Sequence, residues 1–341
     1  MPRELNFAIV GTGSISGHFI KSINEIEGCH ILALCSSNIT RAEAAEAQYG
    51  IRTYTDLQTL LNEVPVDIVC VCTASGRHLE PTLLAARAGK HILCEKPLEI
   101  RTDRVDQMIE ACKTNKVLLG CIFQNRFSPD FIKLRNTVES GLLGKVVAIN
   151  AMIPWYRNEA YYANSGWRGT LEGDGGGALI NQGIHTVDLF QVIGGPVKQV
   201  FGKVQTTIHD IEGEDLATAI VTFTNGVTGL IQASTAMWPG YPERLEVFGE
   251  KGSIILEGGR ISAFNIQGVE TENQVVESEL KSGSSDPMAI SHEFHKRQIR
   301  DFAQSVLNNK KPDIDGTEGR KAVAIIEAIY ESSKRNIPVV F

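Results

Sequence analysis

The residues near the N-terminus with the clearest chemical potential form a glycine-rich turn. Residues 7–10 (FAIV) predict a strand that runs into residues 11–17 (GTGSISG), after which a helix begins. In such a unit the first glycine permits a tight turn and the second lets the backbone approach a pyrophosphate, which the helix N-terminus attracts. The motif predicts a dinucleotide site rather than a glycine turn without a ligand. Its expected cofactor contacts are Gly11, Gly13, Ser14 and Ile15.

The end of the second predicted strand carries no carboxylate. Sites that prefer NAD usually hold the ribose hydroxyls there with Asp or Glu. Here Ser36, Ser37 and Asn38 occupy that point, and Arg41 follows in the next turn. Small side chains leave room for a 2′-phosphate, and a guanidinium can pair with it. The sequence therefore slightly favours NADP over NAD, and the alternative is that Arg41 is a solvated helix residue.

A lysine follows a predicted buried strand, residues 91–94. It belongs to the run Glu95-Lys96-Pro97, and Pro97 restricts the turn that aims it. Ligands of open α/β sheets bind at the carboxyl ends of the strands. Lys96 is therefore a candidate for sharing a proton with a substrate, whereas its alternative is an ordinary surface lysine.

A second candidate group lies on a predicted helix over residues 178–193. Asn181, His185 and Asp188 follow one another at i, i+4 and i+7, so a regular α-helix places them on one face. A buried polar stripe must be hydrogen-bonded or line a cleft, and His185 is its natural general base. The glycines that follow Asp174 would let the backbone approach a ligand. No second cluster accompanies these residues, so we expect no metal site.

The elements that must position these residues fall into two groups. Up to residue 122, short apolar runs alternate with amphipathic stretches, which is typical of βαβ units and a parallel sheet. Beyond it, alternating β segments follow one another without helices, which indicates a largely antiparallel open sheet. We therefore predict an α/β protein with an N-terminal Rossmann domain (1–122) and a C-terminal α+β domain (123–341). The second domain should bind the substrate and form oligomers.

Several element boundaries carry recognisable signals. Thr40-Arg-Ala-Glu43 reads as a capping box that opens a helix ending at Gly50, and Thr102 is expected to cap another. Asn225-Gly226 indicates a hairpin. The predicted strands are 7–10, 31–35, 67–72, 91–94 and 117–122 in the first domain, and 146–153, 197–208, 216–224, 227–237, 244–248 and 253–256 in the second. The predicted helices after residue 123 are 129–140, 178–193, 292–307 and 317–334.

The composition excludes several classes of protein. The 341 residues are 43% hydrophobic and 21% charged, which is ordinary for a globular protein. Their net charge of -7 argues against a nucleic acid or an anionic membrane as partner, because both need a basic surface. The sequence has no apolar run long enough to span a membrane. Seven cysteines lie mostly in apolar runs and read as reduced core residues, so we expect a cytoplasmic protein.

In combination, these motifs resemble the Gfo/Idh/MocA oxidoreductases, which include glucose-fructose oxidoreductase and inositol dehydrogenase. The resemblance covers essentially the whole chain. The motifs that carry it are Gly11-x-Gly13, Ala74-Ser75-Gly-Arg-His78, Ala88-Gly-Lys-His91, Glu95-Lys96-Pro97, Gln124-Asn-Arg126, Gly166-Trp167-Arg168-Gly169, Gly175-Gly-Gly177 and His185-x-x-Asp188.

The resemblance implies roles for several residues. Lys96 and His185 would be the catalytic pair, and the loop Thr73-Ala74-Ser75 would contact the cofactor. The residues expected to border the nicotinamide are His78, Glu95, Gln124, Trp167 and Arg168. The sequence departs from the commonest family pattern at Asn181, where many members carry Asp. Because an amide cannot take a proton, Asn181 would orient the sugar and leave the role of base to His185.

A narrower resemblance concerns the substrate. The segment from Trp155 to Gln182 is most similar to the subgroup that acts on UDP-N-acetylglucosaminuronate at C3. Arginines suit an anionic substrate, and aromatic rings stack on sugars or uracil. The expected substrate contacts are Lys96, Arg126, Arg157, Tyr162, Asn181 and His185, with structural ion pairs as the alternative for each arginine. The expected function is NAD(P)-dependent oxidation of a sugar, cyclitol or nucleotide sugar by a homodimer or homotetramer. The alternatives are an inositol 2-dehydrogenase-like enzyme and a non-catalytic dinucleotide-binding regulator.

Overall fold

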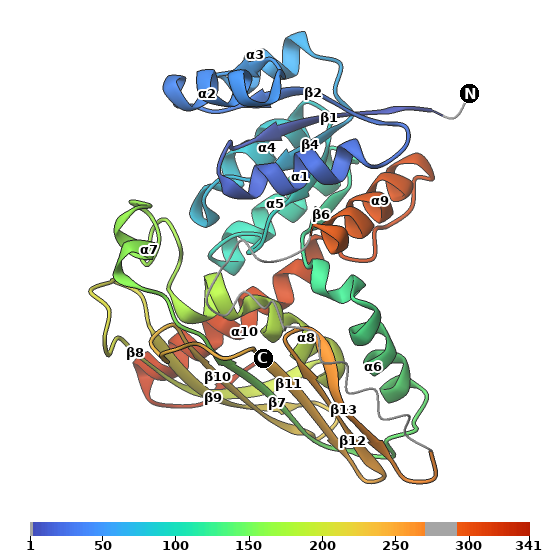
Figure 1. Ribbon diagram of the computed structural model, residues 1–341, viewed down its shortest axis with the longest axis vertical. Coiled ribbons are helices and arrows are strands. Elements are labelled where there is room, and N and C mark those ends of the chain that lie inside the picture. Colours follow the sequence, from blue (N-terminus) through green and yellow to red (C-terminus); the bar gives the residue numbers. More distant parts are fainter. Residues whose placement is uncertain (1–2, 270–291) are drawn as a thin grey trace. The chain divides into compact units, whose positions relative to one another are not determined.

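A computed structural model describes residues 3–269 and 292–341, which divide into two compact units (Figure 1). Unit 1 comprises the described parts of Met1–Gln124 and Ser291–Val323, and unit 2 those of Asn125–Ile290 and Ala324–Phe341. The predicted boundary after residue 122 lies close to this division, but residues 292–323 belong to unit 1 and not to the second domain. The reason is that α9 (Glu293–Leu307) packs against α1 (Ser14–Asn24), a contact between segments far apart in the sequence.

Unit 1 is built on a six-stranded parallel sheet of order β3-β2-β1-β4-β5-β6. The parallel Rossmann sheet predicted from the sequence is confirmed. All these strands end at one edge, where the glycine turn, Ser36, Thr73 and Glu95 follow them. The strands are β1 (Leu5–Val10), β2 (Cys29–Cys35), β3 (Thr53–Tyr54), β4 (Ile68–Val71), β5 (His91–Cys94) and β6 (Leu119–Cys121); the helices are α1, α2 (Ile39–Tyr49), α3 (Leu57–Glu63), α4 (Leu79–Arg87), α5 (Thr102–Thr114), α9 and the first part of α10 (Gly316–Arg335).

Two of the predicted helix caps are wrong by one or two residues. The N-cap of α2 is Asn38, whose Oδ1 accepts the Arg41 N–H at 2.9 Å, and not Thr40. Asn38 is itself a preferred capping residue, so it competes with the Thr40 capping box. The N-cap of α5 is Arg101, and Thr102 is the first helical residue. Strand β3 was not predicted because two residues are too short to show an alternating pattern.

Unit 2 contains an eight-stranded sheet of order β13-β12-β11-β7-β10-β9-β8-β14. Its neighbours pair antiparallel except β10 with β7, which are parallel, so the expected largely antiparallel sheet is confirmed. Asn225 and Gly226 join β9 to β10 as expected, with Gly226 at a φ of 86°. Strands β13 and β14 were not predicted. The strands are β7 (Val146–Pro154), β8 (Val197–Gln205), β9 (Leu216–Phe223), β10 (Thr228–Ser234), β11 (Arg244–Gly249), β12 (Gly252–Glu257), β13 (Arg260–Ile266) and β14 (Val339–Val340).

One face of this sheet carries the core of unit 2. Helix α8 (Ile184–Gly194) packs on β7 and β11 (Figure 1). Ser332 of α10 accepts the Gly202 N–H at 3.0 Å. Residues facing these helices, such as Ile231 and Val247, are fully buried. Further helices of this unit are α6 (Pro129–Glu139) and α7 (Glu159–Ala163). Within residues 3–269 and 292–341, no helix combines the length and apolar character needed to cross a lipid bilayer.

Candidate functional site

The turn after β1 requires glycine at its first position. The Gly11 N–H donates to the Cys35 carbonyl at 2.8 Å, and its φ is 99°. A Cβ at this position would lie 2.5 Å from the carbonyl oxygen of Cys72. Both the positive φ and the close approach of β4 therefore exclude a side chain, so Gly11 shapes the turn.

Gly13 has a different role because its φ of −76° is open to any residue. No heavy atom of the described residues outside its own chain neighbours lies within 4 Å of a Cβ built here, so protein packing does not explain the glycine. The first turn of α1 contains no acidic residue, and the buried Thr12 Oγ1 has no hydrogen-bond partner among the described residues. Open space beside free helix N–H groups suits a pyrophosphate. The residues of the turn thus fit NAD(P), with Ser14 exposed and Ile15 half-buried beside it.

The end of β2 carries the residues expected near the adenosine ribose. Ser36 is buried, and its hydroxyl lies 3.4 Å from the Asn38 carbonyl. Ser37 and Arg41 are exposed at the start of α2. The Arg41 guanidinium is therefore accessible to a ligand at the start of α2, without steric hindrance from the described residues.

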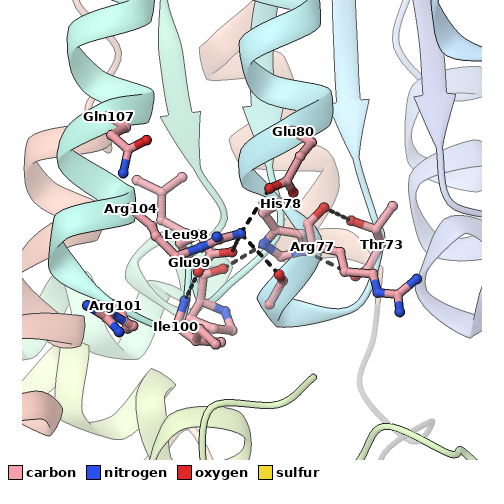
Figure 2. A network of polar contacts seen from close by, with 12 residues as sticks. Thr73, Arg77, His78, Glu80, Leu98, Glu99, Ile100, Arg101, Arg104 and Gln107 are labelled. Atoms are coloured by element: carbon pink, nitrogen blue, oxygen red, sulfur yellow. Dashed lines mark hydrogen bonds and ion pairs between the residues drawn. The ribbon is translucent and has the colours of Figure 1, made fainter. Parts of the chain in front are cut away.

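His78 ties together two loops at the edge of the parallel sheet (Figure 2). Its Nδ1 lies 2.8 Å from the Pro97 carbonyl oxygen and its Nε2 lies 3.1 Å from that of Thr73. The His78 side chain is almost fully buried. In the short turn between Thr73 and His78, Ser75 is also buried and Ala74 is half-buried. His78 therefore holds the Lys96-Pro97 turn, whose peptide bond is cis, against the loop after β4. Its expected contact with nicotinamide stays a prediction.

An ion pair between a buried carboxylate and a partly exposed guanidinium fixes the chain just beyond Lys96 (Figure 2). Glu99 is fully buried, accepts the Ile100 N–H at 2.6 Å and lies 3.1 Å from Nη2 of Arg104 in α5. The same Nη2 reaches the Gly76 carbonyl and Glu80 at 3.3 Å. Sequence reasoning missed Glu99 and Arg104, because a glutamate five residues after a strand is usually expected to be exposed.

Glu95 is a buried carboxylate that contacts both the backbone of Lys96 and a distant helix. Its Oε2 accepts the Lys96 N–H at 2.9 Å, and its Oε1 lies 3.5 Å from Nε2 of His295 in α9. Burial raises the pKa of Glu95, whereas His295 and the charge of Lys96 lower it. Together the two lowering effects outweigh burial, so the pKa of Glu95 lies below its ordinary value. Gln124, which follows β6, is buried, and its Oε1 has no hydrogen-bond partner among the described residues.

The predicted polar stripe of unit 2 does not lie on a regular α-helix. Residues Ala178–Gly183 form a π-helical segment, η3, and α8 begins only at Ile184. The regular spacing assumed for Asn181 and His185 therefore does not hold. Within residues 176–191, His185 is the one side chain that is half-buried rather than buried. It is thus the most accessible side chain of this segment.

Asp188 and Arg126 form a buried bidentate ion pair. The Arg126 Nε and Nη2 donate to the two carboxylate oxygens at 2.7 and 2.6 Å. Both side chains are nearly inaccessible. This geometry supports the structural alternative for Arg126, because a paired guanidinium has fewer donors left for a substrate carboxylate.

A hydrogen-bonded chain of side chains fixes Asn181. Its Nδ2 donates to Asp174 Oδ1 at 2.6 Å, and its Oδ1 accepts from Gln182 Nε2 at 3.1 Å. Gln182 Oε1 in turn accepts from Nε and Nη2 of Arg157 at 3.0 and 2.7 Å. An aspartate at position 181 would place a second carboxylate against that of Asp174, and the two negative charges would repel. The Asp174 carboxylate therefore explains why an amide stands here instead of the Asp of the commonest family pattern.

The aromatic segment of unit 2 surrounds its arginines. The Arg168 guanidinium lies 4.2 Å from the ring centre of Tyr161 and 5.7 Å from that of Trp167. The buried Arg157 lies 5.0 Å from the Trp155 ring. Tyr162 is buried and donates to Thr235 Oγ1 at 2.8 Å. The structure thus gathers most of the predicted substrate contacts of this unit around Gln182 and Tyr161.

Two of the three glycines after Asp174 are required by packing within the protein, and the approach of a ligand to this segment stays a prediction. A Cβ on Gly176 would meet the Tyr330 hydroxyl at 2.3 Å, and one on Gly177 would meet the Glu214 carbonyl oxygen at 2.1 Å. The Glu214 carboxylate accepts the N–H groups of Gly177 and Leu179 at 3.0 and 2.7 Å. It therefore caps the start of η3, a partner that local sequence does not reveal.

The cysteines and acidic residues show no metal centre in the described part of the chain. All seven cysteines are buried and free, and among residues 3–269 and 292–341 no three His, Cys, Asp or Glu side chains cluster suitably for a metal ion. Burial raises the pKa of the thiols of Cys70, Cys72 and Cys94. These thiols are therefore neutral core groups.

A Rossmann sheet with a pyrophosphate-compatible turn and a strand-end lysine defines a nucleotide-binding oxidoreductase. Comparison with protein families agrees: residues 5–123 match the oxidoreductase family with an NAD-binding Rossmann fold, and residues 131–255 match the Gfo/Idh/MocA C-terminal domain. The chain belongs to the Gfo/Idh/MocA family of NAD-binding oxidoreductases, as its motifs predicted.

Individual relatives differ in their named substrates. The chain is 27% identical to myo-inositol 2-dehydrogenase of Thermotoga maritima, with 98% of each chain covered. It is 26% identical to D-apiose dehydrogenase of Paraburkholderia graminis, over 97% of this chain and 88% of the relative. The crystal structure of the WlbA dehydrogenase from Bordetella pertussis, in complex with NADH and UDP-GlcNAcA, superposes with a TM-score of 0.90 at 27% identity, covering 99% of each chain.

Proposed function

We propose that this protein is a dehydrogenase that moves a hydride between nicotinamide C4 and a secondary alcohol of a sugar, cyclitol or nucleotide sugar. The observation that carries the proposal is Lys96, which follows β5 of the parallel sheet and is held by Glu95 through its backbone N–H. A ligand-sensing regulator with the same fold would not need a lysine fixed in this way. The half-buried His185 is the second observation against such a regulator.

The chain's own residues would divide the chemistry as follows. NAD(P), when bound, supplies the hydride acceptor or donor. Lys96 donates a hydrogen bond to the substrate oxygen and stabilises the alkoxide that develops there. His185 takes the hydroxyl proton during oxidation and returns it during reduction. Asn181, fixed by Asp174, orients the sugar.

Among the possible substrates we favour an anionic nucleotide sugar of the UDP-N-acetylglucosaminuronate type. Arg168 stacks on Tyr161, and the network of Arg157 and Gln182 lies on the same aromatic segment. A partly exposed guanidinium beside an aromatic ring suits a sugar carboxylate or phosphate. The likeness to the WlbA dehydrogenase, solved with UDP-GlcNAcA, supports the same class. Inositol oxidation is the second candidate because of the inositol dehydrogenase relative.

The experiment that tests the function is a cofactor-reduction assay with cyclitols, aldoses and UDP-sugars at low and high salt. We expect turnover with a UDP-sugar acid and a KM that rises with salt, since the charge interaction is screened. A lower KM for free inositol, unchanged by salt, would favour the polyol dehydrogenase. No turnover on the whole panel together with tight cofactor binding would support the regulator.

We further propose that NADP(H) binds at least as tightly as NAD(H). Arg41 is exposed at the start of α2, next to Ser37, and Asn38 is the residue that caps this helix. Arg41→Ala should weaken NADP(H) binding about tenfold and leave NAD(H) binding unchanged, because only NADP carries the 2′-phosphate that the guanidinium can pair with. Titration of each reduced cofactor by fluorescence checks this. Equal losses for both cofactors would remove Arg41 from the cofactor site.

The exposed face of the unit 2 sheet supports a homodimer or homotetramer. Ile220 in β9 pairs in register with Phe201 in β8 and Leu230 in β10. These three side chains form an apolar row that is 42–48% exposed. A second copy of the sheet would bury such a row. Sedimentation analysis should therefore show an even-numbered oligomer at micromolar concentration, and a monomer would contradict the proposal.

A further inference from the structure

In unit 1 a buried histidine that belongs to none of the motifs of the family resemblance lies beside Glu95 of the Glu95-Lys96-Pro97 motif. His295 is 3% exposed and its Nε2 lies 3.5 Å from Glu95 Oε1. The other oxygen of the same carboxylate accepts the Lys96 N–H. A single carboxylate therefore connects α9 to the lysine proposed for catalysis.

The helix that supplies His295 is anchored to the sheet and to the dinucleotide helix. Gln298, one turn further along α9, accepts the Phe123 N–H at 3.0 Å and donates to the Cys121 carbonyl at 2.7 Å. The His295 ring lies 5.8 Å from that of His18 and 6.1 Å from that of Phe19, both in α1. The imidazole is thus held between α1 and the end of β5, with little freedom to move away from Glu95.

We infer that His295 is a positioning residue for Lys96, acting through Glu95. The inference rests on the proposed function, since it assigns a role toward the lysine of that function. The imidazole keeps the Glu95 carboxylate ionised and in place, and the ionised carboxylate fixes the backbone of Lys96 by a charge-assisted hydrogen bond. A residue that fixes a reacting group affects turnover more than substrate binding.

The electrostatics of the pocket around Glu95 give the inference a pH signature. Besides His295 and Lys96, the titratable groups near this carboxylate are the thiols of Cys70, Cys72 and Cys94. The His18 ring also lies near His295, tilted by 41° to it. Burial keeps the thiols neutral, so the groups that lower the pKa of Glu95 are His295 and Lys96. Without His295, burial would dominate and raise the pKa of Glu95.

The test compares the full-length protein with His295→Gln over the pH range of activity. We expect kcat to fall about 10- to 100-fold with KM and cofactor affinity nearly unchanged, because only the placement of Lys96 is affected. The acid limb of the kcat profile should move up by about one pH unit or more, because Glu95 now protonates at higher pH. In the double variant His295→Gln/Glu95→Gln, no carboxyl remains to titrate, so the limb should return to its original position.

Two other residues of the same segment provide matched controls. His292 pairs on the surface with Glu25 at 3.0 Å, and His292→Gln should keep the native kcat and profile. Gln298→Ala removes buried hydrogen bonds from the same helix, and should lower the melting temperature without moving the pH limb. If His295→Gln behaves like either control, or if its limb stays shifted in the double variant, the inference is wrong.

A stability measurement separates this inference from the proposed function. In His295→Gln the folded protein disfavours ionised Glu95, so the pKa of this carboxyl is higher in the folded than in the unfolded state. The free energy of unfolding of the single variant should therefore fall, relative to that of the double variant, as pH rises from 5 to 8. This readout needs no substrate. An inactive native protein with this pH-dependent difference would refute the proposed function while retaining the link between His295 and Glu95. Absence of the difference in an active protein would refute the link.

Discussion

Lys96→Ala is expected to lower kcat by about 10²- to 10³-fold while cofactor affinity stays within several-fold of the native value. The ammonium group interacts most strongly with the substrate oxygen when negative charge develops there, so its loss costs transition-state binding rather than ground-state binding. The surrounding structure should survive the change. Glu95 contacts the backbone N–H of residue 96, and His78 contacts the carbonyl of Pro97, so neither interaction needs the lysine side chain.

Steady-state kinetics and cofactor titration of the same preparation measure both quantities. Lys113→Ala is a suitable control because that side chain is 78% exposed on α5. A Lys96→Ala protein with near-native kcat would show that the lysine is not catalytic. A large loss of cofactor affinity with native kcat would instead make Lys96 a cofactor-binding residue.

The parts of the site formed by local sequence were predictable. Gly11 follows a strand and precedes a helix, and the structure shows why no side chain fits there, with Cys72 closing the turn. Lys96 was predicted at a strand end, and β5 ends at Cys94. In both cases the signal is a pattern of a few adjacent residues, which strand and helix periodicity can reveal.

The parts formed by distant segments were not predictable. The partner of Glu95 is His295, separated from it by most of the chain, and the segment Ser291–Val323 was assigned to the wrong domain for the same reason. The Asp174-Gly-Gly-Gly177 motif shows another limit of local sequence. Its glycines accommodate Glu214 and Tyr330, whose approach leaves no trace in the local sequence. A glycine run shows that something lies close to the backbone, but not whether it is a ligand or the protein.

The π-helical segment shows a limit of periodicity itself. A helix over residues 178–193 was predicted with a uniform period, and the structure changes period at Gly183. Such segments often occur at functional sites, since the wider turn displaces one side chain relative to the next. In this segment Asn181 is hydrogen-bonded to Asp174, whereas His185 is half-buried. Asn181 and His185 therefore serve different purposes.

His185→Gln is the second variant with a large expected effect. If His185 accepts the hydroxyl proton, its loss should lower kcat for oxidation by about 10²- to 10⁴-fold. The pH profile should also change. A protonated imidazole cannot act as base, so oxidation by the native protein should slow as pH falls, and the variant should lose this acid limb. In the reverse direction the imidazole must carry the proton, and the variant should lose the alkaline limb instead.

The measurement is the pH dependence of kcat in both directions, with His30→Gln as control because that imidazole is 49% exposed beside Glu4. The result also distinguishes His185 from His295. Removal of a base deletes the acid limb, whereas removal of a positioning imidazole moves the limb to higher pH by raising the pKa of Glu95. An acid limb that remains in His185→Gln, at native pH and with little loss of kcat, would assign the base to another residue of the chain.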